Sequence, residues 1–308
     1  MAAASPEKAR YWRHPGLPQV DLLRARYVRH SFGWHTHDSY VAAVIESGVE
    51  EYGYRGGTHR AGPGTLALVD HGEPHTGHAG VPEGWSYRVL YPSRELMVEV
   101  AAEVGITGTP SYAESVVDDP GAAARVRAAH LAAERGDSLI ASTLTRAALG
   151  LLLRRHGRDR PRAAAPRPAS ARAVALAAET LRARLTDPPR LEELAAAAEV
   201  SPFALLRAFR DVHGLPPHSW LTQRRVERAR ALLAQGVAPG EVAARVGFAD
   251  QAHLTRHFKR KVGVPPGAFQ RGVLQERGDR EAWQGPYRCE PPQYRSRRDD
   301  PPRLGSPV

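Results

Sequence analysis

The sequence contains a single cysteine, Cys289, among its 308 residues. One cysteine excludes an intramolecular disulfide and any zinc cluster built from cysteines. Long hydrophobic runs are also absent, since no apolar stretch approaches the roughly 18 residues that span a bilayer. The N-terminal residues 1–16 lack the apolar core of a secretory signal. These absences predict a cytoplasmic protein with no membrane partner.

The signatures of several common enzyme classes are missing as well. The sequence has no Gly-rich phosphate-binding loop and no nucleophile elbow, and the pair Gly56-Gly57 is typical of a hairpin turn. The composition, with 42% hydrophobic and 25% charged residues, is typical of a globular protein. A chain of this length holds two domains of ordinary size. We therefore expect a two-domain protein that is not an enzyme and carries no cofactor.

Positive charge is concentrated in the C-terminal part of the chain, which has a formal net charge of +10 in total. Residues 1–157 contain 16 basic and 17 acidic residues, whereas residues 170–275 contain 16 basic and 9 acidic residues, a net of +7. Because neutralisation of phosphates drives most nucleic-acid affinity, this asymmetry favours a polyanion partner for the C-terminal part. On charge alone, a solvated basic surface is an equal alternative.

Two different patterns divide the N-terminal half. From Leu22 to about Leu90, apolar and polar residues alternate between turns rich in glycine and proline, as in YVAAVIESG and GPGTLALVD. Short strands spaced in this way are typical of a β-sandwich or barrel. From Ser93 to about His156 the periodicity becomes helical. We expect residues 15–157 to form one domain, a β-barrel with trailing helices.

The rest of the chain divides into three parts. Residues 158–170 are rich in proline and arginine without an apolar anchor, which indicates a linker. Residues 171–274 have helical periodicity throughout and form the expected second, all-α domain. Residues 275–308 are rich in Pro, Arg and Asp, and we expect this tail to be largely disordered.

An internal repeat marks the second domain. The segment LLRAFRDVHGLPPHSW (205–220) aligns with LTRHFKRKVGVPPGAF (254–269) at an offset of 49 residues. A short Ala-rich segment and a tight turn precede each copy, at residues 191–198 and 241–246. A short helix, a turn and a second helix are the layout of a helix-turn-helix unit. The repeat therefore predicts two such units.

Start and stop signals place the second helix of each unit. Ser201 and Asp250 are favourable N-caps, and Gly214 and Gly263 precede Pro-Pro pairs that prevent continuation of the helix. The expected recognition helices are residues 202–213 and 251–262.

A recognition helix presents its exposed N-terminal residues to base edges in the major groove. Arginine bonds guanine, glutamine bonds adenine, and apolar side chains contact the thymine methyl group. The expected DNA contacts are Phe203, Leu206, Arg207, Arg210, Gln251, Ala252, His253, Thr255, Arg256 and Lys259. The helix between the units, LTQRRVERARALLAQG, has its own apolar stripe and bridges them rigidly. One chain then reaches two successive major-groove faces about 34 Å apart.

Residues 171–271 resemble the DNA-binding domain of the AraC/XylS family of transcriptional regulators. The phrase EVAARVGFADQAHLTRHFKRKVGVPPGAF is similar to that family's signature over its whole length. The resemblance implies a sequence-specific transcription factor with two helix-turn-helix units joined by a long helix, whose partner is double-stranded DNA. For an activator it also implies RNA polymerase as a partner.

Histidines cluster in the N-terminal half. The segment GWHTHDSYVAAVIESG places His35 and His37 two residues apart, on one face of a strand, and AGPGTLALVDHGEPH ends at His75. This arrangement, over about residues 20–90, is similar to the cupin-type sensor domain at the N-terminus of many AraC-family regulators. The resemblance implies that this half senses an effector.

Two interpretations of the histidines compete. In the first, His35, His37 and His75 bind a metal ion, since imidazoles are common ligands for transition metals. Metal-binding cupins usually have a glutamate shortly after the histidine pair, whereas here Val41 and Ala42 occupy those positions. This departure favours the second interpretation, an unknown small-molecule effector in the mouth of the barrel. The expected pocket residues are Trp34, His35, His37, Tyr40, His75, Trp85 and Arg88.

Three alternatives stay open at this point. The apolar stripe of SLIASTLTRAALGLLLRRH packs either on the barrel or against a second subunit, and the family resemblance favours a homodimer. A metal-dependent cupin enzyme with an appended DNA-binding domain would need a complete metal site. A DNA-repair protein of the AraC-like type would need reactive cysteines, for which Cys289 alone is a poor candidate.

Overall fold

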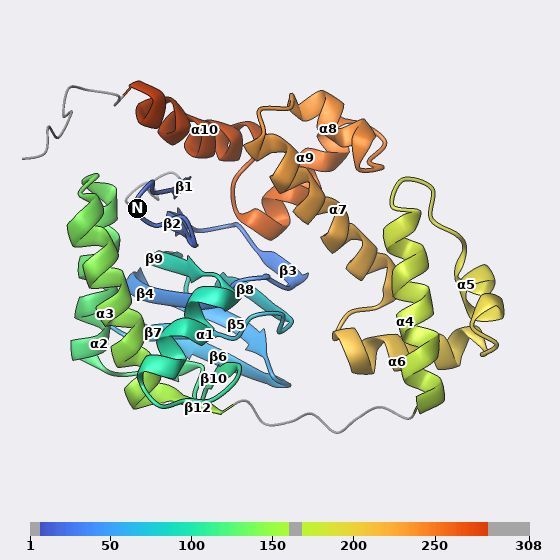
Figure 1. Ribbon diagram of the computed structural model, residues 1–308, viewed down its shortest axis with the longest axis horizontal. Helices are drawn as coiled ribbons and strands as arrows, with labels where there is room; N and C mark the ends of the chain where they lie inside the picture. The colour runs from blue at the N-terminus through green and yellow to red at the C-terminus, as the bar shows by residue number, and fades with distance from the viewer. Residues whose placement is uncertain (1–6, 160–167, 283–308) are drawn as a thin grey trace, which may run out of the picture.

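The computed structural model describes residues 7–159 and 168–282, which form a sheet-rich domain followed by a helical domain (Figure 1). This confirms the predicted α+β architecture of two domains. The strands differ from the prediction because they do not close into a barrel. They form a six-stranded and a four-stranded antiparallel sheet, whose facing side chains share one hydrophobic core.

The six-stranded sheet has the order β1-β2-β9-β4-β7-β11, with the strands Lys8–Arg13, Val20–Tyr27, Trp85–Pro92, Val41–Gly48, Leu66–Val69 and Val116–Val117. The four-stranded sheet has the order β3-β8-β5-β6, with the strands Phe32–His35, His75–Ala79, Glu50–Tyr54 and Gly57–Ala61. Two short strands, β10 and β12, pair with each other and span Pro110–Tyr112 and Gly157–Asp159. The first domain thus begins before residue 15, because β1 pairs with β2 over its whole length.

Both faces of the six-stranded sheet are covered, and β4 shows how its sequence achieves this. Val41, Ala43 and Ile45 point to the four-stranded sheet. Ala42 and Val44, one residue out of phase, point to the helices on the other side. A strand buried on both faces has a continuous apolar run rather than a simple alternation, as seen in VAAVI.

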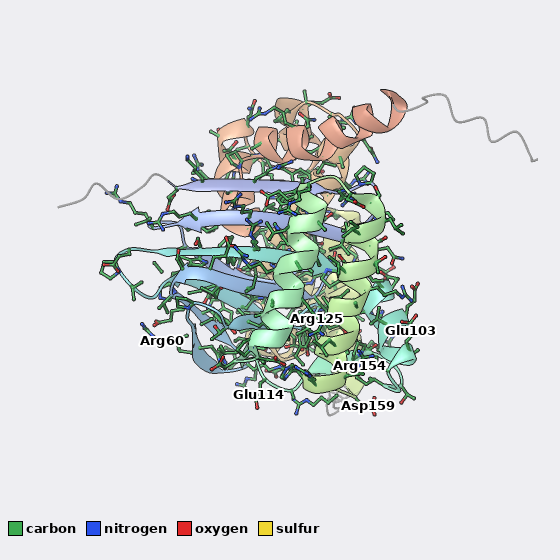
Figure 2. All side chains as sticks on the ribbon, turned by 90° about the vertical axis from the view of Figure 1, so that its left-hand side faces the viewer. Arg60, Glu103, Glu114, Arg125, Arg154 and Asp159 are labelled. Atoms are coloured by element: carbon green, nitrogen blue, oxygen red, sulfur yellow. The ribbon has the colours of Figure 1, made fainter. Side chains whose placement is uncertain are left out.

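Three helices follow the strands of the first domain: α1 (Arg94–Glu103), α2 (Pro120–Glu134) and α3 (Ser138–His156). Side-chain caps start all three, from Ser93, Asp119 and Asp137 respectively. Figure 2 shows α2 and α3 lying across the outer face of the six-stranded sheet. These helices form a third layer of the domain and bury the outer face of the six-stranded sheet.

The second domain contains seven helices in the described residues: α4 (Pro168–Ala183), α5 (Leu191–Ala197), α6 (Pro202–His213), α7 (Pro217–Ala234), α8 (Pro239–Arg245), α9 (Gln251–Val262) and α10 (Pro266–Ala282). The pairs α5–α6 and α8–α9 form the two predicted helix-turn-helix units, and α7 connects them (Figure 1). The bounds of α6 and α9 coincide with those expected from the sequence. Helix α10 continues seven residues beyond 275, into the segment expected to be a tail. Residues 160–167 of the expected linker and 283–308 of the expected tail lie outside the described residues.

The two helix-turn-helix units differ in what completes their cores. The first unit packs with α4 around Leu205, Phe209 and Trp220, in a cluster formed by the second domain alone. In the second unit, Leu254 and Phe258 belong to the same cluster as the residues between the two sheets. Helix α7 contributes its first half to one cluster and its second half to the other. The second unit is therefore packed as part of the first domain.

Candidate nucleic-acid interface and effector cavity

Local sequence signals set the ends of both candidate recognition helices. The Ser201 hydroxyl accepts a hydrogen bond from a backbone N–H of the first turn of α6, and the Asp250 carboxylate does the same for α9. Gly214 and Gly263 end the helices with φ values of 68° and 86°, a region that favours glycine. The caps predicted from the sequence are confirmed.

Helix α6 exposes one face and buries the other. Leu205 and Phe209 are fully buried, as their spacing of four residues predicts. Phe203 is 67% exposed, and the guanidinium of Arg207 lies 4.8 Å from the centre of its ring. This cation–π pair presents a flat apolar surface and a positive charge together. Of the remaining expected contacts on this helix, Arg210 is exposed and Leu206 is half-buried.

Helix α9 has the same orientation of its side chains, with Leu254 and Phe258 fully buried. Thr255 is half-buried, and its hydroxyl donates to the Gln251 carbonyl one turn earlier. The ring of His253, also half-buried, packs against Phe248. The exposed members of the expected set on this helix are Gln251, Ala252, Arg256 and Lys259.

Part of the exposed face of α9 lies beside the first domain. Thr255, Arg256 and Lys259 line an open groove of about 710 Å³ together with residues of the turn between β2 and β3. The carboxylate of Glu7 holds this turn, because it accepts the backbone N–H groups of residues 28–30 at 2.6–2.9 Å. The basic side of α9 thus faces an open space bordered by the sheets.

A cavity of about 40 Å³ lies between the two sheets of the first domain. Since a water molecule needs about 10–15 Å³ on this measure, the space holds a few waters or a small ligand. Aromatic and apolar side chains form most of its wall, with three imidazoles and one carboxyl group as the ionisable groups other than tyrosine hydroxyls. The lining residues are Phe32, His35, His37, Val41, Ala43, Glu50, Tyr52, Ala67, Val69, His75, Thr76, Tyr87 and Tyr91.

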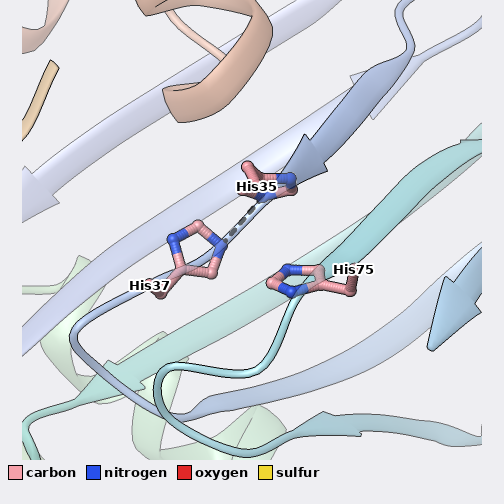
Figure 3. Close-up of side chains that lie close together, drawn as sticks. All are labelled: His35, His37 and His75. Atoms are coloured by element: carbon pink, nitrogen blue, oxygen red, sulfur yellow. Dashed lines mark hydrogen bonds between the residues drawn. The ribbon is translucent and has the colours of Figure 1, made fainter. Parts of the chain in front are cut away.

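The three expected histidines come together at this cavity (Figure 3). His35 and His75 are direct partners across the β3–β8 pair, and His37 follows two residues after His35. The Nε2 atoms of His35 and His37 lie 3.2 Å apart, and each of the three residues has a ring nitrogen within 4.8 Å of the others. The sequence therefore identified a true cluster, which has the donor atoms to hold a metal ion.

Burial keeps these imidazoles neutral. Burial, assisted by the positive charge of Lys261, lowers the pKa of His75 to about 4. The pKa values of His35 and His37 also lie well below the usual range, first because of burial and then because of the neighbouring imidazoles. Neutral imidazoles are donors and acceptors of hydrogen bonds and ligands for metal ions, rather than partners for an anion.

Glu50 is the carboxyl group of the cavity. Glu50 is only 8% exposed, and burial raises the pKa of its carboxyl group to about 8. At neutral pH most molecules carry this carboxyl in its protonated form, which donates as well as accepts a hydrogen bond. The cavity therefore contains a neutral acid in an otherwise aromatic wall.

Four of the expected pocket residues do not line this cavity. Trp34 is 53% exposed at the surface. Trp85 is buried among aromatic rings between the sheets. Tyr40 and Arg88 point to the other side of the six-stranded sheet, where Tyr40 bonds the Pro110 carbonyl. Alternation accounts for Trp34 and Arg88, because their strand neighbours His35 and Tyr87 line the cavity and adjacent residues of a strand point to opposite faces.

Arg88 is instead held by ion pairs on the helix-covered face of the sheet. Its guanidinium forms ion pairs with Glu46 at 2.7 Å and Glu134 at 2.5 Å, and it also contacts His130. A buried arginine with two carboxylate partners ties β9 to α2 and β4. The expected role of Arg88 in the effector pocket is therefore wrong, because its partners lie on the helix-covered face of the sheet.

Sequence reasoning also missed several lining residues, namely Glu50, Tyr52, Tyr87 and Tyr91. Tyr87 and Tyr91 alternate with Arg88 and Leu90 on β9, so they face the cavity while their neighbours face the helices. The signal was present as the alternation of SYRVLY. The alternation alone does not tell which of the two faces of β9 borders the cavity. That face is known only once the pairing and packing of the strands are known.

Comparison with known proteins agrees with both domains. Residues 17–149 match the family model described as AraC-like ligand binding domain, and residues 194–272 match a model described as Helix-turn-helix domain. None of the helices within the described ranges is long and apolar enough to cross a membrane.

Individual relatives match either most of the chain or a part of it. The HTH-type transcriptional regulator YbfI of Bacillus subtilis is 26% identical over 237 residues, which cover 76% of this chain and 86% of the relative. The HTH-type transcriptional regulator RipA of Corynebacterium glutamicum is 38% identical over 109 residues, or 35% of this chain and 32% of the relative. The crystal structure of ToxT from Vibrio cholerae superposes with a TM-score of 0.50 at 11% identity and covers 87% of this chain and 98% of that chain. The fold is thus shared over both domains.

Proposed function

The chain belongs to the AraC/XylS family of DNA-binding transcription regulators with an N-terminal ligand-binding domain, and from this premise we propose that α6 and α9 read two successive major-groove faces of one operator. The observation that carries the proposal is the pair of capped helices with the same inward residues and basic outward faces. A single helix, α7, connects them and fixes their spacing. The base contacts in this proposal are the ten residues expected from the sequence.

The two helices offer different chemistry to DNA. Arg256 and Lys259 on α9 and Arg207 on α6 supply positive charge, and Gln251 supplies a donor and an acceptor for adenine. The stacked Phe203 of α6 suits an apolar contact with a thymine methyl group. We propose that α9 reads its bases mainly by hydrogen bonds and α6 partly by apolar contact.

The remaining partners follow from the family and the surface of the molecule. We propose that a small-molecule effector enters the cavity between the sheets and changes operator affinity. We propose further that the protein acts in the cytoplasm as a homodimer, and on RNA polymerase where it activates. Leu139 and Ile140 on α3 are 76% and 50% exposed, which supports a role of α3 in dimer contacts.

Genomic footprinting of the full-length protein tests this function. The wild-type protein should give discrete sites that vanish in the Arg207→Ala/Arg256→Ala variant. Arg228→Ala removes an exposed positive charge from α7, outside both recognition helices, and serves as the matched control. In a titration with one such site at fixed salt, Arg256→Ala alone should weaken binding by about 1–3 kcal/mol, roughly 5- to 150-fold, and relax sequence preference.

Two outcomes would contradict the proposal. Equal losses for Arg228→Ala and Arg256→Ala would show that charge alone, and no base contact of α9, supports binding. Diffuse binding by the wild-type protein would favour an enzyme that uses the histidine cluster and only carries a nucleic-acid-binding domain.

A further inference from the structure

The histidine cluster has the dimensions of a metal site. Two nitrogens that bind one zinc ion tetrahedrally, each at about 2.0–2.1 Å, lie about 3.3 Å from each other. The Nε2 atoms of His35 and His37 are 3.2 Å apart. The third donor, from His75, completes a group whose ligand atoms all lie within 4.8 Å (Figure 3). Binding of all three nitrogens to one ion would require only that His75 approach the other two from within this distance.

Hydrogen bonds fix the tautomers that metal binding requires. Nδ1 of His35 lies 2.9 Å from the Gly33 carbonyl oxygen, and Nδ1 of His75 lies 3.0 Å from the Glu73 carbonyl oxygen. A carbonyl oxygen only accepts, so each Nδ1 carries the hydrogen and each Nε2 keeps its lone pair. Metal-binding histidines are oriented in this way by an outward hydrogen bond of the second ring nitrogen. Two of the three imidazoles are thus already set as ligands.

The donor set determines which ion fits. Among the described residues the group consists of three imidazoles, without a carboxylate or a thiolate. Imidazole suits zinc, copper, nickel and iron, whereas magnesium and calcium prefer oxygen. The adjoining cavity of about 40 Å³ leaves space for a water or a small exogenous ligand in a fourth position.

We propose that His35, His37 and His75 bind one divalent transition-metal ion, with zinc as the first candidate, and that this ion, rather than an organic small molecule, is the effector that the cavity binds. The effector part rests on the function proposed above, whereas the ion site rests on the geometry of the cluster alone.

The segment that carries two ligands also holds the DNA-binding domain. His35 and His37 point to the cavity, and the residues between and beside them point the other way. The Thr36 carbonyl accepts a buried hydrogen bond from Gln223 of α7 at 2.9 Å. Nζ of Lys261, on α9, lies 3.5 Å from the Trp34 carbonyl oxygen. Residues 34–37 therefore connect the ion site to α7 and α9.

The third ligand has a similar connection to α6. Pro74, next to His75, packs against Gly214 so closely that a Cβ at Gly214 would lie 2.1 Å from Pro74 Cγ. Gly214 is the residue that ends α6. An ion that pulls His75 toward His35 and His37 moves both ligand segments and thereby shifts α6 relative to α7 and α9. Such a shift gives the two states of the DNA-binding domain different affinities for the ion, which is the requirement for allosteric control.

The first experiment measures ion binding by the untagged, chelator-treated full-length protein. Titration with Co²⁺, followed by its visible absorption and then by displacement with Zn²⁺, should show one site per chain. His75→Ala should weaken binding at least tenfold. His78→Ala, three residues further on the same strand and outside the cluster, should bind as the wild type does. Circular dichroism of each variant checks that it is folded.

The second experiment measures affinity for an operator fragment, found by footprinting, with and without Zn²⁺. The proposal expects a change of at least fivefold in the wild type and in His78→Ala, and none in His75→Ala. Operator binding without any ion binding would overturn the ion site and leave the regulator intact. Ion binding with unchanged operator affinity would overturn the role as effector. Absence of operator binding in every state would contradict the proposed function, while the Co²⁺ titration alone would decide the ion site.

Discussion

Replacing Glu50 by glutamine should make the stability of the protein less sensitive to alkaline pH. Glu50 is buried between the sheets, and its pKa of about 8 in the native state lies well above the ordinary value of 4.5. The native state therefore binds this proton more tightly than the unfolded state does between these two pH values. Stability from this group is fully present below pH 4.5 and is lost as pH rises toward 8.

The size of the effect follows from the two pKa values. The two pKa values differ by about 3.5, and each pKa unit corresponds to about 1.4 kcal/mol. Ionisation of Glu50 can therefore lower the free energy of unfolding by at most about 5 kcal/mol. Glutamine has nearly the same shape and no charge at any pH. Glu50→Gln should thus equal the wild type in stability near pH 4.5 and exceed it by a few kcal/mol at pH 9.

Urea denaturation of chelator-treated protein at pH 5, 7 and 9 measures this difference. The buried histidines gain stability with rising pH, but they are common to both proteins and cancel from the comparison. Glu51→Gln, the neighbouring residue with its side chain on the other face of β5, is the matched control. A difference between Glu50→Gln and the wild type that does not change with pH would refute the description of Glu50 as a buried, protonated acid.

Three further changes probe the second domain. Phe258→Ala, at a fully buried site, should cost about 3–5 kcal/mol in urea denaturation, and a cost below 1 kcal/mol would contradict its place in the core. Gly272→Ala would place a Cβ 2.1 Å from the Tyr11 carbonyl oxygen, so the melting temperature should fall; a rise, as helix propensity alone predicts, would mean that α10 is not docked on β1. Ser201→Ala should cost about 1 kcal/mol, because the backbone N–H of Ala204 loses its cap, and an unchanged denaturation midpoint would argue against the cap.

The helix-turn-helix units could be predicted from the sequence because their signals are local. Ser201 and Asp250 start the recognition helices, and Gly214 and Gly263 end them. Each signal acts within one turn of the residue that carries it, so no knowledge of distant contacts is needed. The histidine cluster was found for a similar reason, since a spacing of two places His35 and His37 on one face.

The wall of the cavity could not be predicted, because it depends on which strands become neighbours. The six-stranded sheet is buried on both faces, so alternation alone does not reveal which face borders the cavity. Arg88 and Tyr87 are adjacent in sequence, yet one pairs with Glu134 of α2 and the other lines the cavity. That the expected barrel does not close could not be predicted, for a related reason. Short alternating strands are typical of both barrels and sandwiches, so the pattern does not tell the two apart.

The unequal packing of the two helix-turn-helix units gives the two copies of the repeat different freedom to diverge. The second copy has to pack against the strands of the first domain and also fit DNA, so a substitution there is tolerated only if it preserves both contacts. The buried core of the first copy lies within the second domain, although Gly214 at the end of α6 contacts Pro74 of the first domain, and its outward face has to fit the operator. Regulators that share an ancestor with this chain should therefore acquire new target sites chiefly through substitutions in α6. The base contacts of α9 should change less.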